Sequence, residues 1–175
     1  MTVYFKHKNL IIRAMKQADA EAFSEAFSLQ GWHKSIELFT GYFNQQESGE
    51  RKVLVAEVDG QVAGYITMLP KAETGPFAAQ NIPELADFNV LINFQTRGIG
   101  TQILDVAEQL AKEFGNSISL AVGLHSGYGR AQRMYVRRGF APDGSGVWYQ
   151  GRQLNQYALC ANDDDLVLYM KKDLK

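Results

Sequence analysis

The stretch of sequence that decides the fold is a loop with two glycines, Gln95-Thr96-Arg97-Gly98-Ile99-Gly100-Thr101. Behind this loop, apolar residues recur at helical spacing and predict an amphipathic helix: Ile103, Ala107, Leu110 and Phe114. Gly115 follows the pattern, where a left-handed C-terminal cap favours glycine. The first N–H groups of a helix have no intrahelical partner, and the helix dipole favours negative charge there. Because glycine lets a phosphate approach the backbone, the loop is a candidate phosphate site, with a plain strand-to-helix connection as the alternative.

Known phosphate-binding patterns differ in how well they match this loop. A Walker A loop requires a Gly-Lys pair before Ser or Thr, and the chain contains no Gly-Lys pair. A dinucleotide fingerprint requires Gly or Ala three residues after its second glycine, and that position holds Ile103. The pattern that fits is Gln/Arg-x-x-Gly-x-Gly/Ala, with Gln95, Gly98 and Gly100 at its defined positions.

Periodicity predicts the elements on both sides of the loop. A short strand over 10–14 precedes two helices, one beginning near Asp19 and one over about 35–46. The pair Asp59-Gly60 suits a type I′ turn and predicts a hairpin of strands 53–58 and 62–69. The remaining predictions are a loop over 71–83, strands 84–91 and 117–122, a helix over about 130–138, and a tail 140–172 with two strands around a polar, aromatic insert. This order indicates an α/β (α+β) fold, a mixed sheet covered by helices.

Composition and charge limit the class of protein. The 175 residues include 46% hydrophobic and 21% charged residues, which is typical of one folded domain over 1–175. A net charge of −1 argues against a nucleic-acid binder, whose domains are usually basic. Cys160 is the one cysteine, and neither a signal peptide nor a membrane-spanning stretch is recognised. We therefore expect a reduced, cytoplasmic protein with no nucleic-acid or membrane partner.

The loop resembles the pyrophosphate loop of the GNAT acyltransferase superfamily, and two neighbouring features agree. Val90 lies five residues before Gln95, where these proteins commonly place a strand valine beside the pantetheine arm. Downstream residues match the family's second signature, Asn-x-x-Ala-x-x-x-Tyr-x-x-x-Gly-Phe, in spacing: Ala131, Tyr135, Gly139 and Phe140. The resemblance spans about 10–172 and is specific over about 84–140, the expected cofactor-binding core. It implies a mostly antiparallel sheet of about seven strands with about four helices.

The resemblance also implies acetyl-CoA as cosubstrate and assigns residues to it. The expected cofactor contacts are Phe88, Val90, Leu91, Ile92, Gln95, Thr96, Arg97, Gly98, Ile99, Gly100, Thr101, Tyr128, Ala131 and Tyr135. Backbone N–H groups near 88–91 are the expected oxyanion donors. Tyr128 replaces the family's asparagine, and Ile92 replaces a frequent proline. Arg130, Arg133 and Arg137 recur along one helix as a solvated face or as a site for the cofactor's 3′-phosphate.

Acetyl transfer to an amine requires a base for the amine and an acid for the departing sulfur. The resemblance assigns the acid to Tyr135 and leaves Glu84 and Asp87 as candidate bases, with His125 as a third. On a regular strand, Glu84 shares a face with Phe88 and Asp87 points away, but a bulge would reverse that facing.

The acceptor and the partners are less constrained. Residues about 28–48 and the insert 143–165 are expected to line the acceptor site, which suggests a small polar amine or a peptide amine. The sequence leaves open whether the protein forms a homodimer. The three histidines and one cysteine lack the spacing of metal ligands, so no metal is expected. An acyl-CoA sensor without transfer activity is the alternative function, and a nucleic-acid adaptor using the arginine face is a further rival.

Overall fold

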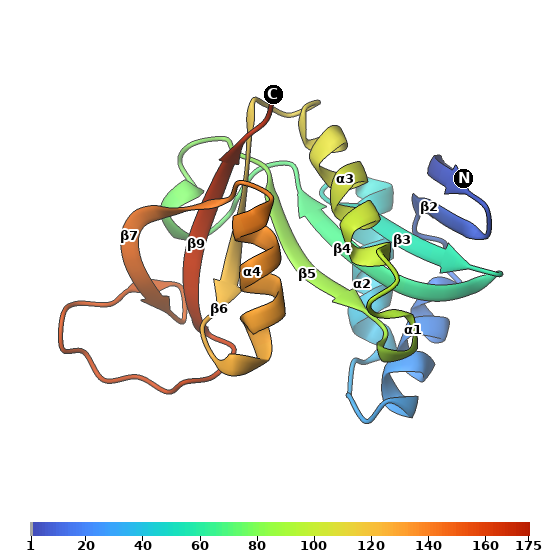
Figure 1. The fold of residues 1–175 in the computed structure, drawn as a ribbon, viewed down its shortest axis with the longest axis horizontal. Coiled ribbons are helices and arrows are strands. Elements are labelled where there is room, and N and C mark those ends of the chain that lie inside the picture. Colours follow the sequence, from blue (N-terminus) through green and yellow to red (C-terminus); the bar gives the residue numbers. More distant parts are fainter. Residues whose placement is uncertain (1) are drawn as a thin grey trace. The chain divides into compact units, whose positions relative to one another are not determined.

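A computed structural model describes residues 2–175, coloured by sequence in Figure 1. Its internal contacts divide the chain into two compact units, and each is described by itself. The first unit contains the chain up to Leu69 together with Ala86–Leu110, and the second contains Pro70–Leu85 and Ala111–Lys175. The expectation of a single domain over 1–175 stays a prediction.

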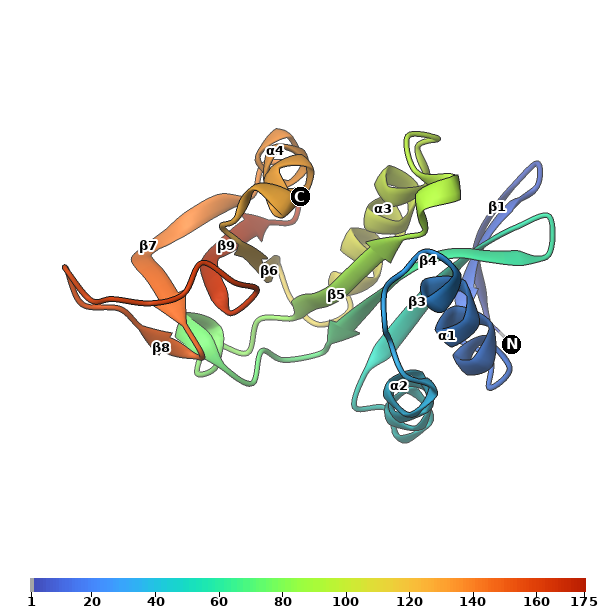
Figure 2. The same cartoon turned by 90° about the horizontal axis from the view of Figure 1, so that it is seen from below.

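The first unit carries a run of antiparallel strands and three helices. Its elements are β1 (Val3–His7), β2 (Leu10–Ala14), α1 (Asp19–Leu29), α2 (Ile36–Ser48), β3 (Lys52–Val58), β4 (Gln61–Leu69), most of β5 (Glu84–Val90), the 3₁₀ turn η2 (Ile92–Phe94) and α3 (Ile99–Ala111). Hydrogen bonds order the strands β1-β2-β3-β4-β5. Figure 2 shows α2 and α3 on opposite faces of these strands.

Aromatic side chains form the core between the strands and the helices α1 and α2. Phe23, Phe27, Phe39 and Tyr65 are each at most 1% exposed. Their rings lie 5.0 to 6.4 Å apart, centroid to centroid. Aromatic groups bury large areas and favour tilted contacts, so this cluster fixes both helices against β4.

The predicted helix over about 35–46 and the predicted hairpin of this unit both form. Ser35 caps α2 by accepting a hydrogen bond from the Leu38 N–H (3.3 Å). Asp59 and Gly60 both have positive φ, 51° and 80°, as a type I′ turn requires. The predicted hairpin is confirmed, with Val58 paired to Gln61.

The second unit holds the other strands and the shortest helix. Its elements are the 3₁₀ turns η1 (Gly75–Phe77) and η3 (Ser126–Tyr128), the strands β6 (Ser117–Gly123), β7 (Ala141–Tyr149), β8 (Arg152–Gln153) and β9 (Leu166–Asp173), the helix α4 (Gly129–Arg137), and the first residues of β5. Hydrogen bonds order the strands β5-β6-β9-β7-β8. The β5–β6 pairing is parallel, at Glu84↔Ser119 and Leu85↔Leu120, and β6 pairs antiparallel with β9.

The predicted class, a mostly antiparallel sheet with four helices, is confirmed, with two corrections. Residues 2–175 form nine strands instead of about seven, because β1 and the two-residue β8 were not predicted. The predicted left-handed cap at Gly115 is wrong, since α3 ends at Ala111 and Gly115 has no positive φ. The Ala111 carbonyl instead accepts hydrogen bonds from the N–H groups of Phe114 (3.0 Å) and Gly115 (3.2 Å), which end the helix without a left-handed residue.

Candidate active site

The glycine loop leads from β5 directly into the N-terminus of α3. The Gln95 side-chain amide donates a hydrogen bond to the Val90 carbonyl (3.0 Å) and closes the loop onto its own strand. Thr96 and Gly98 have positive φ, 62° and 79°, so the chain turns sharply twice before the helix. The Gln102 N–H bonds the Gly98 carbonyl (3.0 Å), so the N–H groups of the first turn precede the intrahelical ladder and can bind an anion.

The two glycines of the loop are required for different reasons. A Cβ added at Gly98 would have nothing within 4 Å, so this position favours glycine through its positive φ alone. A Cβ added at Gly100 would lie 3.3 Å from Phe88 Cζ and 3.5 Å from Val90 Cγ2. The structure therefore brings three predicted cofactor residues, Phe88, Val90 and Gly100, against one another.

The end of β5 is held by groups that the sequence did not indicate. The Leu91 N–H donates to the Ala63 carbonyl (2.9 Å), so this N–H is engaged and is not an open oxyanion donor. The Ile92 N–H donates to Gln30 Oε1 (3.0 Å). A Cβ at Gly64 would lie 2.7 Å from the Asn89 carbonyl oxygen, so β4 and β5 approach closely only because this residue is glycine.

A backbone irregularity interrupts β5 at Asp87, whose φ is +42°. A left-handed residue of this kind is typical of a bulge, the irregularity that the sequence analysis named for this strand. The side chains of Asp87 and Asn89 contact residues of α2 and β4. The side chains of Phe88 and Val90 instead lie against Gly100, at the start of α3. Asp87 therefore points away from Phe88, as expected for a regular strand, and the irregularity does not reverse its facing.

The Asp87 carboxylate is the centre of a dense polar cluster. Its Oδ1 accepts from Lys34 Nζ (2.7 Å) and Asn89 Nδ2 (2.8 Å). Its Oδ2 accepts from the hydroxyls of Tyr65 (2.6 Å) and Tyr42 (2.9 Å). A carboxylate offers about four lone-pair sites, so these four donors occupy them all. We call these five residues the Asp87 cluster.

The tyrosines of the Asp87 cluster stay protonated. Burial and then the Asp87 charge raise the pKa of Tyr65 and of Tyr42 well above the ordinary value. Both phenols are therefore neutral donors at physiological pH. Sequence analysis missed the whole set of partners, although Lys34 and Tyr42 fall within the acceptor range 28–48.

The second unit carries the other predicted catalytic residues. Tyr135 on α4 is 7% exposed, and its ring lies 5.7 Å from that of Phe140. Burial is the main cause that raises the Tyr135 pKa, so its hydroxyl holds a proton at neutral pH. Glu84 is 9% exposed at the start of β5, and its charge contributes to the raised pKa of Tyr169.

His125 and Tyr128 both contact the Asp164 carboxylate in this unit. His125 Nε2 lies 2.9 Å from Asp164 Oδ1, and the Tyr128 hydroxyl donates to the same oxygen (2.9 Å). The Gly127 N–H donates to His125 Nδ1 (3.1 Å). Both ring nitrogens of His125 are therefore engaged, which disfavours it as the base.

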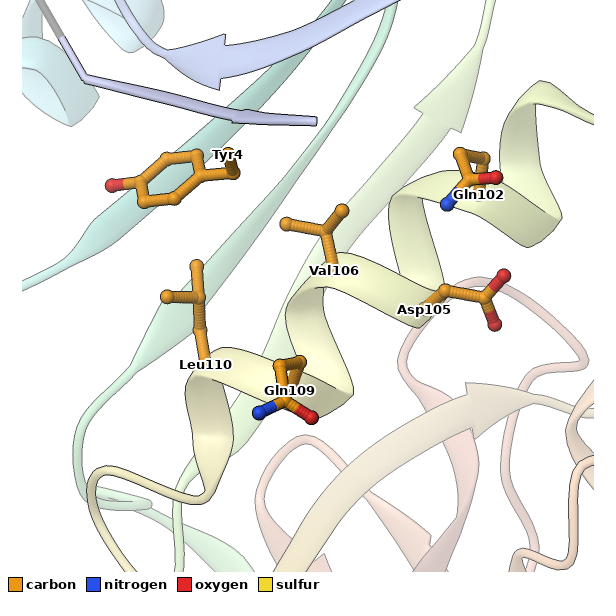
Figure 3. Close-up of a pocket in the computed structure, with 6 residues that line it drawn as sticks. All are labelled: Tyr4, Gln102, Asp105, Val106, Gln109 and Leu110. Carbon is orange, nitrogen blue, oxygen red and sulfur yellow. The ribbon is translucent and has the colours of Figure 1, made fainter. Parts of the chain in front are cut away.

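A small cavity lies apart from the predicted site residues. It measures about 190 Å³ and lies between β1 and α3 of the first unit. Figure 3 shows its lining: Tyr4, Gln102, Asp105, Val106, Gln109 and Leu110. None of these residues carries a predicted catalytic or cofactor role.

Two further searches of the structure concern metals and membranes. Among residues 2–175, no group of three or more His, Cys, Asp or Glu side chains is arranged to hold a metal ion. No helix in the described part of the chain is both long and apolar enough to cross a membrane.

Comparison with solved structures places this fold among acetyltransferases. Ard1 from Thermoplasma volcanium has a TM-score of 0.68 at 19% identity and covers 96% of this chain and 99% of its own. The yncA protein of Salmonella typhimurium, solved with its cofactor acetyl-CoA, has a TM-score of 0.69 at 16% identity, covering 96% and 95%. At these identities the likeness shows the fold alone.

Sequence comparison is more specific. An N-alpha-acetyltransferase of Sulfurisphaera tokodaii is 31% identical over 97 residues, which are 52% of this chain and 57% of that relative. The chain thus spans little more than half the length of this curated relative. The model of the Acetyltransferase (GNAT) family matches residues 12–140, which include the glycine loop, the Asp87 cluster and Tyr135. The chain therefore belongs to the GNAT family of acetyltransferases.

Proposed function

We propose that this protein transfers the acetyl group of acetyl-CoA to a primary amine by direct attack of the amine on the thioester. The observation that carries the proposal is the glycine loop at the start of α3. There, a positive φ at Gly98 and the bare backbone of Gly100 leave the first-turn N–H groups accessible to a pyrophosphate. Membership of the GNAT family supports the same assignment.

The loop fits the cofactor, and its residues have separable tasks. The N–H groups of residues 99–101 would bind the pyrophosphate, and the side chains of Phe88 and Val90 would border the arm that carries the thioester. When bound, acetyl-CoA supplies an activated acetyl group on sulfur. The other proposed contacts are Leu91, Ile92, Gln95, Thr96, Arg97, Tyr128 and Ala131.

The base is either Asp87 or Glu84. Asp87 accepts a proton from an incoming amine only if one of its four donors leaves, because its lone pairs are occupied. Lys34 is the donor most able to move, since it belongs to a connecting segment and its side chain is 23% exposed. Glu84→Gln and Asp87→Asn, assayed side by side, identify the base as the variant whose rate recovers at high pH, where free amine is abundant.

The acceptor is an amine of a small molecule or of a peptide. Relatives point to peptides: the curated relative is an N-alpha-acetyltransferase, and a Salmonella typhimurium structure with a TM-score of 0.72 at 14% identity is of an enzyme that modifies the N-terminal serine of ribosomal protein L7/L12. That structure covers 99% of this chain and 100% of its own. A peptide with a free N-terminus therefore belongs in any panel of acceptors.

The test is a thiol-release assay with acetyl-CoA and a panel of amines and peptides, on the wild type and on Tyr135→Phe. If Tyr135 protonates the departing sulfur, the phenylalanine variant loses about 10²–10⁴-fold in kcat with cofactor affinity preserved. A variant within twofold of wild type contradicts the acid role. Saturable acetyl-CoA binding without turnover on any amine contradicts the transferase and supports an acyl-CoA sensor.

A further inference from the structure

Lys34 places an amine of the chain itself inside the Asp87 cluster. Its Nζ lies 2.7 Å from Asp87 Oδ1 and 2.9 Å from the Tyr65 hydroxyl. The same nitrogen lies 5.6 Å from the ring centroids of both Phe27 and Tyr65. A carboxylate, a phenol oxygen and two aromatic faces together are the groups that recognise an ammonium ion.

The segment that carries Lys34 is hydrogen-bonded to Ile92, one of the proposed cofactor contacts. It connects α1 to α2, and its Gln30 side chain accepts a hydrogen bond from the Ile92 N–H, just past β5. Asp87 immediately precedes Phe88, whose ring lies at Gly100 in the glycine loop. Asp87 thus holds the Lys34 amine from the β4 and α2 side of β5, while the Phe88 side chain reaches α3, and 23% of the Lys34 side chain is exposed.

The distance between Lys34 and Asp87 is that of an amine and its base. A general base acts when it lies about 2.6–3.2 Å from the atom whose proton it removes. Lys34 Nζ meets this condition toward Asp87 Oδ1. Lys16, by comparison, lies 3.4 Å from Glu57 Oε2, and 44% of its side chain is exposed.

We infer that Lys34 is a site of self-acetylation, which rests on the proposed acetyl-CoA-dependent function. The Lys34 ammonium gives one proton to Asp87, which releases it to solvent, and the neutral nitrogen attacks the thioester carbonyl carbon. The carbon–nitrogen bond forms, the carbon–sulfur bond breaks, and the nitrogen loses its second proton as the departing sulfur takes one up. The products are one Nε-acetyl-Lys34 and one free coenzyme A thiol for each chain.

Acetylation changes the cluster in a way that ends the reaction after one turnover. The acetylated nitrogen has no charge, so it loses the ion pair with Asp87 and the attraction to the two rings. Asp87 then keeps three of its four donors and has a lone pair for an external amine. Self-acetylation would thereby convert a filled ammonium site into an open one.

The experiment incubates the purified full-length protein with acetyl-CoA and no added amine, followed by intact mass and peptide mapping. We expect one acetyl group on Lys34, at a first-order rate that is independent of protein concentration. Lys16 is the internal control and should react at least about tenfold more slowly, since it lacks a base at catalytic distance. Lys34→Arg keeps the charge and should lose the rapid mass increase.

A second variant tests the role of the carboxylate. Asp87→Asn should slow Lys34 acetylation by about 10²-fold while Lys16 reacts as before. An unchanged Lys34 rate in Asp87→Asn would overturn the inference, as would equal rates at Lys34 and Lys16, or a rate proportional to protein concentration.

Calorimetry with acetyl-CoA and thiol release with external amines separate the two proposals. If the wild type binds acetyl-CoA and acetylates an added amine while Lys34 stays unmodified, self-acetylation is wrong and the proposed function stands. If acetyl-CoA does not bind, both are wrong.

Discussion

The Asp87 cluster is centred on β5 and the glycine loop follows that strand in the sequence, yet the two are built in opposite ways. The loop uses the backbone of consecutive residues 95–101, shaped by positive φ at Thr96 and Gly98. The cluster uses side chains from four separate segments, whose partners lie up to 53 residues from Asp87 in the sequence. A site made of local backbone depends on a few conformations, whereas a site made of distant side chains depends on the whole unit being folded.

This difference predicts which property each region controls. Changes in the loop should alter cofactor affinity with little loss of stability, because its glycines pack against few groups. Changes in the cluster should alter stability and acceptor turnover, because buried polar networks are costly to leave partly unpaired. The following variants test that separation.

Gly100→Val should give the largest effect, on acetyl-CoA affinity. Even the Cβ meets Phe88 Cζ at 3.3 Å, and the two methyl groups of valine add bulk where the phosphate must approach. A hydrogen bond lost to a charged group costs about 1.5–3 kcal/mol, so Kd should rise roughly 10–150-fold. Calorimetric titration with acetyl-CoA measures it.

Gly98→Ala is the matched control for the loop. Its Cβ meets nothing within 4 Å, so only the strain of a positive φ remains, about 1 kcal/mol of unfolding free energy. Equal losses of affinity in Gly98→Ala and Gly100→Val would show that loop conformation, and not steric access, controls binding.

Asp87→Asn should give the second largest effect, on stability. The amide cannot accept all four hydrogen bonds, and Lys34 loses its negative partner. Leaving partly buried donors unsatisfied costs about 1–3 kcal/mol, and the exposure of Lys34 places the loss at about 2 kcal/mol. Urea denaturation measures the change, and acetyl-CoA affinity should stay within about twofold. An unchanged midpoint would mean that the cluster does not stabilise the unit.

Sequence analysis correctly predicted the elements that depend on residues close together in the sequence. The Asp59-Gly60 turn and the helix over about 35–46 depend on residues a few positions apart, and the structure agrees with both predictions. The prediction of a left-handed cap at Gly115 was wrong because the Ala111 carbonyl accepts hydrogen bonds from the N–H groups of Phe114 and Gly115. Periodicity in the sequence does not reveal these bonds.

The Asp87 cluster could not be derived because its contacts are long-range. Tyr65 and Tyr42 lie 22 and 45 residues from Asp87 in sequence, and no local pattern connects them. A bulge in this strand was considered without a position, since an aspartate in a strand does not reveal its backbone conformation, and the positive φ at Asp87 leaves its side chain facing away from Phe88. The family resemblance included Lys34 within a broad acceptor range but gave it no role.

The third largest effect is a loss of unfolding free energy at alkaline pH, caused by Tyr65. Burial and the Asp87 charge raise its pKa in the folded state, so above about pH 10 the unfolded chain loses a phenolic proton that the folded chain keeps. The unfolding free energy therefore falls as pH rises, by about 1.4 kcal/mol per pH unit for this tyrosine. Tyr65→Phe should flatten the slope, as followed by denaturation between pH 9 and 11. Tyr157→Phe, at a side chain 91% exposed, should keep the wild-type slope.

Tyr42→Phe should have the smallest effect and gives the sharpest test of the comparison. It removes one hydrogen bond to Asp87 Oδ2, an oxygen that keeps its shorter bond from Tyr65, and it retains the ring against Phe39. The expected loss is about 0.5–1 kcal/mol of unfolding free energy, with acetyl-CoA affinity unchanged. Thermal melting and calorimetry on one sample measure both quantities. If Tyr42→Phe weakens acetyl-CoA binding as much as Gly100→Val does, the loop and the cluster respond as one site, since a hydroxyl that touches only the cluster would then control the affinity assigned to the loop.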